Sequence, residues 1–327
     1  YDLLADGYTY VDKSDPTVFI NVNSIIWTGG NITIVEHTHK YEPEGTQYAW
    51  VCACGLSCLH PDYSEGACSV CGRICPHSDA TGTGEGKYTC DECKEQMLVR
   101  VDKADGSYAF GTDFQAAMNA AEDGTKITLL ADVEQSRKSR IVGGGKTVTL
   151  DLNGHKITGG WIDVGDTDND YTSCTLQIVG RGSFETTWGS ISVDLKCTLD
   201  LSGWTGGTIS RINITDSSNY PANEREAGLI VGPDAGTIQE LSFGNNQLDT
   251  IMRTKFSGGS YDRIYVAAHS KEVQLGSLLA EGYAFQSSDG TYVDYTQTLQ
   301  GSYIYNLTVV KCPHVKVENG TCAYCNT

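Results

Sequence analysis

The sequence predicts a mainly β protein whose centre is a parallel β-helix, with one capping helix and small zinc-ribbon-like Cys/His segments. Three observations support this prediction. A seven-residue strand motif returns at intervals of 21, 26 and 23 residues, the cysteines concentrate in two parts of the chain, and the two ends repeat each other at an offset of 275 residues. The regular return of one strand motif is typical of a solenoid whose turns stack on one another.

The strand motif reads VTLDLNG from Val148, CTLQIVG from Cys174 and CTLDLSG from Cys197, with ITLLADV from Ile127 as a weaker copy. Its first, third and fifth positions are apolar. This alternation predicts a strand, and the Gly that ends the three full copies predicts a turn. Aligned motifs would stack in three buried rows. The rows are Val148, Cys174 and Cys197; Leu150, Leu176 and Leu199; and Leu152, Ile178 and Leu201.

Upstream of these motifs, the stretch TDFQAAMNAAEDG from Thr112 predicts a helix. Thr112 is placed to serve as its N-cap and Gly124 to end it. We expect this helix to cover the open end of the solenoid with one apolar face. That face consists of Phe114, Ala117, Met118 and Ala121.

The charge and the hydropathy of the chain argue against two classes of partner. Its 41 acidic residues outnumber its 23 basic residues, which gives a formal net charge of -18. Binding to nucleic acid would therefore oppose the field of the whole surface. No stretch approaches the ~18 consecutive apolar residues that a membrane span needs, so we expect no membrane insertion. The chain opens at Tyr1, and we expect any export signal to lie outside this sequence.

The two ends of the chain resemble each other without a gap. LLADGYTY from Leu3 aligns with LLAEGYAF from Leu278, and NITIVEHTH from Asn31 aligns with NLTVVKCPH from Asn306. This repeat predicts a tandem array, an organisation typical of surface or scaffold proteins. The predicted segments are the tail of a preceding unit (1–36), a Cys/His-rich zinc-binding linker (37–98), the parallel β-helix (99–277), a tail that repeats 3–36 (278–311) and the start of the next Cys/His unit (312–327).

A Cys-x-His pair followed by Cys-x-x-Cys occurs three times, and each copy supplies three thiolates and one imidazole. This is the donor set of a closed, structural zinc site, which leaves no open position for a catalytic water. We expect three or four zinc ions in all. The three sets are Cys58, His60, Cys68 and Cys71; Cys75, His77, Cys90 and Cys93; and Cys312, His314, Cys322 and Cys325. A fourth, degenerate set is His37, His39, Cys52 and Cys54.

Alternatives remain open at several of these residues. Eight of the 13 cysteines lie between Cys52 and Cys93, and such a density also suits a disulfide framework in an oxidising compartment; the regularly spaced histidines favour zinc. Cys174 and Cys197 are interpreted as small buried thiols, although adjacent turns would also allow a disulfide. An acidic run either binds calcium or forms a solvated loop. It lacks the Gly and distal Glu of an EF-hand, which favours the solvated loop. Its members are Asp163, Asp166, Asp168 and Asp170.

Between Tyr108 and His269, the predicted helix followed by ITLLADV and TVTLDLNGHKITG resembles the opening of right-handed parallel β-helices of the pectate-lyase-like type. Such modules occur in large repetitive surface proteins of gut Firmicutes. The Cys/His segment is similar to linker repeats of exported Firmicutes proteins, with Cys68 to Gly72 as one instance. The resemblance implies a right-handed solenoid in an extracellular protein of a bacterial cell surface. A leucine-rich-repeat solenoid is the alternative fold, because ELSFGNNQLDTI from Glu240 has that character.

Two functions of different class follow from these expectations. The first is a non-catalytic binding and adhesion module that recognises a host glycan or glycoprotein, because tandem arrays gain avidity from weak sites; neighbouring repeat units would be further partners. The second is a β-helix polysaccharide lyase or glycosidase, which needs paired carboxylates or a basic residue. Asp151 and Asp200 share an outward position in the motif. The copy between them has Gln177 at that position, and no Arg or Lys joins the two carboxylates there. We therefore expect binding rather than catalysis.

Overall fold

A computed structural model shows two compact units. The first comprises Tyr1–His77 and Asp91–Glu95, and the second comprises Ser78–Cys90 and Gln96–Thr327. The residues that the structure describes are 8–12, 32–36, 41–44, 49–52, 63–64, 67–69, 73–83, 87–136, 138–141, 145–165, 173–194, 196–215, 227–244, 253–268, 272–314, 317–318 and 321–325.

Within its described residues, the first unit contains three antiparallel hairpins. They are β1 (Tyr8–Asp12) with β2 (Ile32–Glu36), β3 (Tyr41–Glu44) with β4 (Ala49–Cys52), and β5 (Tyr63–Ser64) with β6 (Ala67–Cys68). An isolated two-stranded hairpin is marginally stable in water. This unit therefore depends on contacts beyond the pairing within its hairpins.

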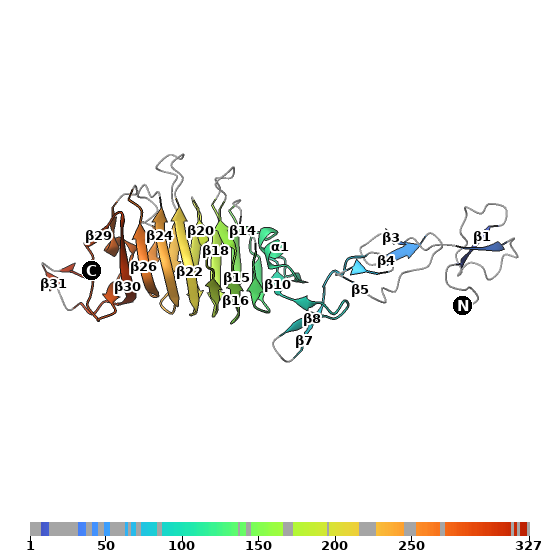
Figure 1. Ribbon diagram of the computed structural model, residues 1–327, viewed down its shortest axis with the longest axis horizontal. Coiled ribbons are helices and arrows are strands. Elements are labelled where there is room, and N and C mark those ends of the chain that lie inside the picture. The colour runs from blue at the N-terminus through green and yellow to red at the C-terminus, as the bar shows by residue number, and fades with distance from the viewer. Residues whose placement is uncertain are drawn as a thin grey trace. The chain divides into compact units, whose positions relative to one another are not determined.

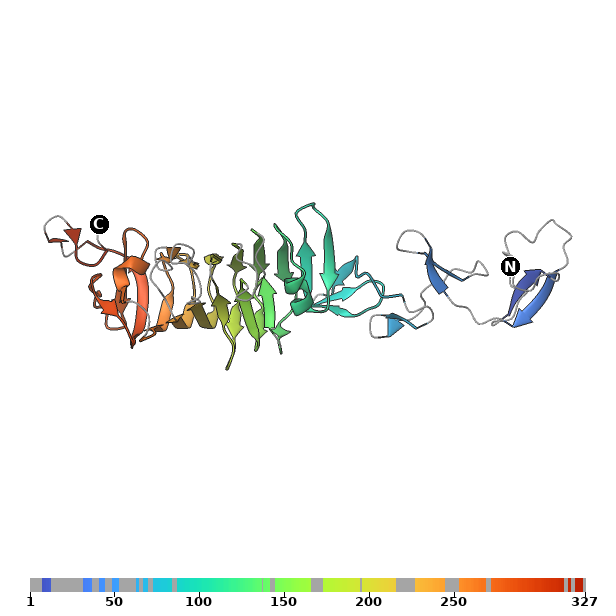
Figure 2. The ribbon, with the colours of Figure 1, turned by 90° about the horizontal axis from the view of Figure 1, so that it is seen from above.

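The second unit is a parallel β-solenoid whose strands return at the spacing of the sequence motif (Figures 1 and 2). Two sheets run along it, and each turn of the chain adds a strand to both. The first sheet consists of β10 (Val99–Asp102), β11 (Tyr108–Gly111), β12 (Lys126–Leu129), β15 (Thr147–Asp151), β18 (Thr175–Gly180), β21 (Thr198–Trp204), β23 (Gly228–Val231) and β25 (Lys255–Phe256). From β12 to β25 every neighbouring pair is parallel.

The second sheet is larger and forms the other wall of the solenoid. It consists of β13 (Val133–Glu134), β14 (Lys138–Ile141), β16 (Lys156–Thr158), β17 (Trp161–Val164), β19 (Ser183–Glu185), β20 (Ile191–Val193), β22 (Thr208–Thr215), β24 (Thr237–Gly244), β26 (Ser260–Val266), β28 (Tyr283–Ser287) and β30 (Ser302–Lys311). Apolar side chains from both sheets form one continuous core between them. The prediction of a mainly β, parallel solenoid is confirmed.

The predicted stacking rows are wrong by two residues on β15. Val148 lies beside Leu176, and Leu176 lies beside Leu199, whereas Leu150 lies beside Ile178. Side chains alternate between the two faces of a strand with a period of two, so a two-residue shift leaves each one on its original face. The apolar pattern identified the buried positions correctly because a two-residue shift leaves the alternation unchanged.

The helix also lies where it was predicted, but both of its ends differ. It ends at Asn119 with Ala120 as its C-cap, so the prediction that Gly124 ends it is wrong. α1 (Phe114–Asn119) is capped by Asp113, whose carboxylate accepts a hydrogen bond of 3.0 Å from the backbone N–H of Ala116. The prediction of Thr112 as N-cap is therefore wrong. Phe114 and Met118 are buried in the solenoid core, and the β10–β11 hairpin pairs antiparallel with β12. Together, helix and hairpin close this end of the solenoid.

The opposite end of the solenoid is closed by antiparallel strands. β30 pairs antiparallel with both β26 and β28, and side chains of both β28 and β30 belong to the solenoid core. The smaller elements of the second unit are β7 (Ala80–Gly82), β8 (Tyr88–Cys90), β9 (Gln96–Met97), β27 (Val273–Gln274), η4 (Leu275–Leu278), β29 (Thr298–Leu299), β31 (Val317–Glu318) and β32 (Thr321–Cys322).

The segment from Glu240, which suggested leucine-rich repeats, begins in β24 with residues 240–244, and its remaining residues 245–251 lie outside the described residues. This strand pairs in parallel with β22 on one side and with β26 on the other, so it is one more strand of the β-helix. The leucine-rich-repeat alternative is therefore excluded.

Candidate metal centres and binding groove

Two of the predicted Cys/His sets come together in the structure. In each, the four ligand atoms all lie within 4.8 Å of one another. Both sets begin with Cys-Pro-His, and both histidines have positive φ angles, 46° at His77 and 51° at His314. This left-handed turn is uncommon for a residue other than Gly. The two centres are Cys75, His77, Cys90 and Cys93, and Cys312, His314, Cys322 and Cys325.

The C-terminal centre sits beside the end of β30. The Sγ atoms of Cys312 and Cys322 are 3.4 Å apart, and Cys325 Sγ lies 3.4 Å from His314 Nδ1. The backbone N–H of Cys312 donates to the carbonyl of Gly282 at 2.9 Å, which ties the centre to the turn before β28. Cys322 is fully buried, and the small cluster around it includes Ala284 of β28.

The two buried thiols of this centre differ in acidity. Burial raises the pKa of Cys312 to about 12. Burial also acts to raise the pKa of Cys322, but the backbone N–H of Tyr324 and the thiol of Cys312 outweigh it and lower that pKa to about 7. Cys322 is therefore the thiol that ionises first, and a thiolate is the form that binds a metal ion.

The other centre is surrounded by carboxylates. Cys75 Sγ lies 3.7 Å from Glu92 Oε2, and His77 Nε2 lies 3.3 Å from Glu95 Oε2. His77 Nε2 is buried, yet it makes no hydrogen bond of acceptable geometry to any described residue. A buried ring nitrogen without a hydrogen bond is costly, and a metal ion in the centre of this cluster would satisfy it.

The other two predicted metal sets fall almost entirely outside the described residues. Of the set that begins at Cys58, the structure describes Cys68, which is buried. Of the degenerate set, it describes the backbone of Cys52 at the end of β4. Both sets therefore stay predictions. The residues outside the described part are His37, His39, Cys54, Cys58, His60 and Cys71.

Cys174 and Cys197 are buried and face each other across neighbouring turns. Their Sγ atoms lie 3.0 Å apart, and the backbone N–H of Thr198 donates to the carbonyl of Cys174 at 2.9 Å. The thiol of Cys174 lowers the pKa of Cys197 by donating a hydrogen bond to it. The two thiols therefore contact each other within the wall of the solenoid.

The residues proposed for calcium binding or catalysis are arranged differently from the sequence expectation. Asp163 lies in β17 and is buried, whereas the other three residues of its acidic run lie outside the described residues. Gln177 is in register with Asp200, but Asp151 is in register with Val179. Asp151 instead contacts the ammonium of Lys126 at 2.9 Å. The expectation that Asp151 and Asp200 share one row is wrong because of the two-residue shift of β15.

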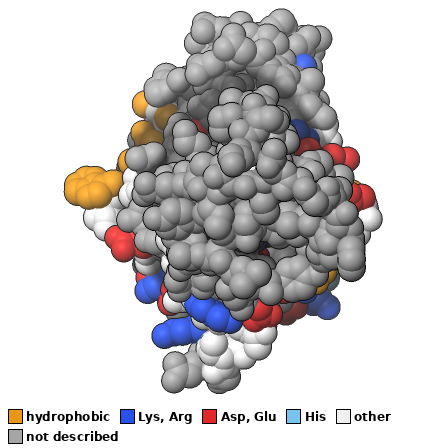
Figure 3. Space-filling view, turned by 90° about the vertical axis from the view of Figure 1, so that its right-hand side faces the viewer, with side chains coloured by type: hydrophobic (Ala, Val, Ile, Leu, Met, Phe, Trp, Pro, Cys, Tyr) orange, Lys and Arg blue, Asp and Glu red, His pale blue; other side chains and the backbone are white. Residues whose placement is uncertain are grey.

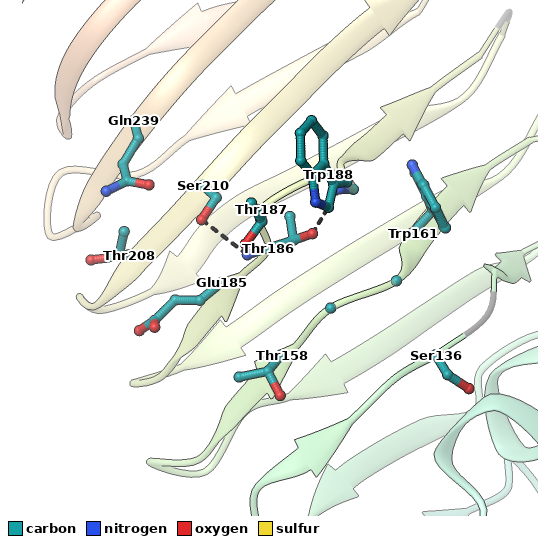
Figure 4. Close-up of a pocket in the computed structure, with 13 residues that line it drawn as sticks. Ser136, Thr158, Trp161, Glu185, Thr186, Thr187, Trp188, Thr208, Ser210 and Gln239 are labelled. Atoms are coloured by element: carbon teal, nitrogen blue, oxygen red, sulfur yellow. Dashed lines mark hydrogen bonds between the residues drawn. The ribbon is translucent and has the colours of Figure 1, made fainter.

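Sequence reasoning missed a groove on the outer side of the second sheet. It has a volume of about 750 Å³ and lies at the corners where β16 leads to β17 and β19 leads to β20. Figure 4 shows Trp161 and Trp188 on one side and Thr158 and Glu185 on the other. The lining residues are Ser136, Thr158, Gly159, Gly160, Trp161, Glu185, Thr186, Thr187, Trp188, Gly189, Thr208, Ser210 and Gln239.

The two tryptophans are exposed although indole is among the most apolar side chains. Trp188 has 82% of its surface exposed and Trp161 has 39%. Two hydrogen bonds hold the corner that carries Trp188. The backbone N–H of Gly189 donates to Thr186 Oγ1 at 2.7 Å, and the backbone N–H of Thr186 donates to Ser210 Oγ at 3.1 Å. The signal in the sequence was a Trp beside Gly, recurring 27 residues apart at Trp161 and Trp188.

A polar ladder crosses the strands on the other side of the groove. Thr158 is in register with Glu185, and the pairing of the neighbouring strands places Ser210 and then Gln239 next along the ladder. Adjacent strands lie about 4.8 Å apart, so the ladder offers a polar group at each step along the solenoid. Glu185 is the one carboxylate in the lining, and it contacts Lys156 Nζ at 3.4 Å.

The described side chains on the face drawn in Figure 3 carry both signs of charge. The described side chains visible in Figure 3 include acidic and basic groups side by side, with hydrophobic side chains gathered at one edge. Acidic groups predominate over the whole chain, which has a net charge of -18. No helix in the described part of the chain combines the length and the apolar character needed to cross a membrane.

Comparison with known proteins identifies no relative. Models of protein families, curated proteins and solved structures were all searched, and none of them matches this chain.

Proposed function

We propose that this chain is a non-catalytic glycan-binding module of a tandem-repeat protein on a bacterial cell surface, with a host glycan or glycoprotein as its ligand. The observation that carries this proposal is the groove with its two exposed tryptophans. The chain leaves 82% of Trp188 and 39% of Trp161 exposed, although burial of an aromatic side chain is strongly favourable. Exposed apolar groups beside polar ones are typical of binding sites.

The chemistry of the groove suits a sugar chain. The C–H faces of a sugar ring pack against an indole, while its hydroxyl groups require hydrogen-bond partners around the rim. The groove supplies both, with Trp161 and Trp188 on one side and the polar ladder on the other. Glu185 accepts hydrogen bonds from hydroxyl groups, and bonds to a charged acceptor are about twice as strong as neutral ones.

The charge of the groove favours neutral glycans over anionic ones. Among the described residues, the lining contains no Lys or Arg, and its one ionisable side chain is Glu185, which contacts Lys156 Nζ at 3.4 Å. Carboxylated or sulfated sugars would meet this carboxylate and the negative field of the chain. We therefore expect neutral glycans to bind more tightly than pectin-like acidic polymers.

The same lining supports binding over catalysis. Glycosidases of the common types act with two carboxyl groups on opposite sides of the scissile bond, and this groove contributes one. The alternative function is a β-helix lyase or glycosidase. Incubation of the chain with neutral and acidic polysaccharides, with and without calcium, is expected to release no reducing ends or unsaturated products. Turnover that disappears in Glu185→Gln would establish the alternative.

Both Cys/His centres are proposed to hold structural zinc. A zinc ion bound tetrahedrally, at about 2.3 Å from sulfur and about 2.0 Å from nitrogen, holds its ligand atoms about 3.5–3.8 Å apart. The two distances of 3.4 Å in the C-terminal centre are close to this spacing. Calcium prefers oxygen ligands, so three sulfurs and one imidazole favour zinc.

A glycan array tests the proposed function. The full chain is expected to bind neutral glycans on the array, and the double variant Trp161→Ala with Trp188→Ala is expected to lose about tenfold or more in affinity, as central aromatic contacts do when truncated. Tyr305→Ala removes an exposed aromatic ring from β30, outside the groove, and serves as the matched control. Failure of the full chain to bind any glycan would refute the proposal.

A further inference from the structure

The sequence repeat between the two ends of the chain is also a repeat of strand pairing. In the first hairpin, Tyr8 of β1 pairs with Glu36 of β2. In the second, Tyr283 of β28 pairs with Lys311 of β30. Adding 275 to each residue of the first pair gives the second pair, and the other pairs of the two hairpins follow the same offset. The two copies therefore share strand direction and register.

This shared register is set by the strands themselves. A two-residue turn fixes the register of a hairpin by its own geometry, but residues 13–31 separate β1 from β2 and residues 288–301 separate β28 from β30. With connections of this length, the register follows the pattern of apolar side chains on the strands. The same pattern at both ends indicates that the two hairpins pack against the same kind of surface.

The C-terminal hairpin shows what this surface is. β30 pairs on its second edge with β26, which is the last parallel strand of its sheet. Phe285, Leu307 and Val309 insert into the solenoid core and are at most 5% exposed. The β28–β30 hairpin thus covers both the open backbone edge of the last turn and the end of its core.

The N-terminal copy has the strand pattern of this cap, while the last turn of this chain's solenoid is already covered by β30. The counterparts of Phe285, Leu307 and Val309 are Tyr10, Ile32 and Ile34, which are also apolar or aromatic. Within the described residues, β1 and β2 form a sheet of two strands, so the second edge of β2 carries no strand. An open edge with unpaired N–H and C=O groups is a template for another strand.

We infer that the β1–β2 hairpin caps the last turn of another β-helix unit, with β2 pairing antiparallel to a strand of the β26 type. In this chain the corresponding edge of β26 is filled by β30. The partner is therefore a further copy of the solenoid unit. Main-chain hydrogen bonds to the edge supply affinity, and the alternating apolar side chains supply specificity. This inference does not depend on glycan binding.

Exchange of the two caps within the full chain tests the inference. Residues 278–311 are replaced by residues 3–36, which keeps the length and the 275-residue register. The chimera is expected to unfold cooperatively with a melting temperature several degrees lower. The decrease is expected because the buried Leu299 becomes Ser24 and the buried Ala284 becomes Thr9.

A register control gives this exchange its meaning. Replacement of residues 278–311 by residues 4–37 shifts the same strands by one position, which turns their apolar side chains away from the core. This shifted chimera is expected to lose the cooperative transition of the last turns. If the in-register chimera melts like the shifted one, the N-terminal hairpin is not a cap and the inference is wrong.

A second measurement avoids any replacement within the solenoid. A copy of residues 99–277 is placed directly before Leu3 of the full chain, which offers β2 the turn that it is inferred to cover. Hydrogen exchange at the amides of residues 32–36 is then expected to slow by about tenfold or more relative to the unextended chain. Unchanged exchange rates in the extended chain would overturn the inference.

Discussion

Cys174 and Cys197 show how tightly the solenoid wall constrains single residues. Their Sγ atoms lie 3.0 Å apart, and a Cβ placed at Gly165 would also lie 3.0 Å from Cys197 Sγ. Interiors packed this closely respond to the addition of one methyl group. The alignment of Val148 with both cysteines in the sequence motif predicts that valine fits at their positions. The structure contradicts this alignment, since Val148 lies beside Leu176 instead of Cys174.

Substitution Cys197→Val is therefore expected to destabilise the protein by about 1–3 kcal/mol through overpacking. Cys197→Ser keeps the size of the side chain and serves as the control for the change of chemistry. Urea unfolding in the presence of a reductant measures both variants without interference from disulfides. A valine variant as stable as the wild type would contradict the packing described here.

The corners between strands are the elements that create the groove. Gly189 belongs to the corner before β20, and a Cβ added to it would lie 1.6 Å from the carbonyl oxygen of Gly160 on the preceding turn. The two corners approach each other at the backbone, which leaves the neighbouring Trp161 and Trp188 pointing outward. A glycine is required at position 189 because any side chain would force the turns apart.

Gly189→Ala is expected to lower the free energy of unfolding by about 1–3 kcal/mol or more and to weaken glycan binding with it. Gly244→Ala is the matched control, because a Cβ at Gly244 meets no atom within 4 Å. Thermal unfolding of both variants checks the prediction. Equal effects of the two substitutions would show that the corners can separate without cost.

The two Cys/His clusters, which we propose hold zinc, are elements whose stability is expected to depend on the ion. Removal of the metal with a chelator is expected to expose Cys312 and Cys322 to alkylation, because the hairpin formed by β31 and β32 is too short to hold its fold alone. The solenoid thiols of Cys174 and Cys197 are expected to stay unreactive, since both are buried in its wall. Mass spectrometry of the alkylated protein distinguishes the sites. Recovery of Cys312 and Cys322 in disulfides, with or without chelator, would refute a metal centre.

Periodic features of the sequence predicted the elements well, and aperiodic features were missed. Alternating apolar residues identified the strands of the solenoid, and the spacing of Cys and His identified two clusters whose ligand atoms lie close enough to hold a metal ion. The register of β15 was missed because a shift by two residues preserves the alternation. The N-cap was misplaced because Thr112 and Asp113 are adjacent and both suit that role. The groove was missed because its recurring signal, a Trp beside Gly at Trp161 and Trp188, lies outside the alternating apolar pattern of the strand motif.

At the scale of the whole molecule, the chain combines a solenoid, two Cys/His clusters and two hairpins of matching register. The solenoid places the groove on a regular wall, and in the inferred array the N-terminal hairpin would close the unit before it. Such an array would multiply weak binding sites along one chain. The acidic net charge of -18 would disfavour contacts between such arrays and contacts with anionic polymers.

The measurement that tests the proposed function most directly is an NMR titration of the tryptophan indole N–H signals with a neutral glycan identified on the array. The chain has five tryptophans, and single Trp→Phe variants assign their signals. Trp204 is an internal control, because it is fully buried and its Nε1–H donates to the carbonyl of Gly182 at 2.9 Å. If the groove binds the glycan, the signals of Trp161 and Trp188 shift together and saturate while that of Trp204 stays in place. Saturable binding that leaves the signals of Trp161 and Trp188 unchanged would contradict the groove as the binding site.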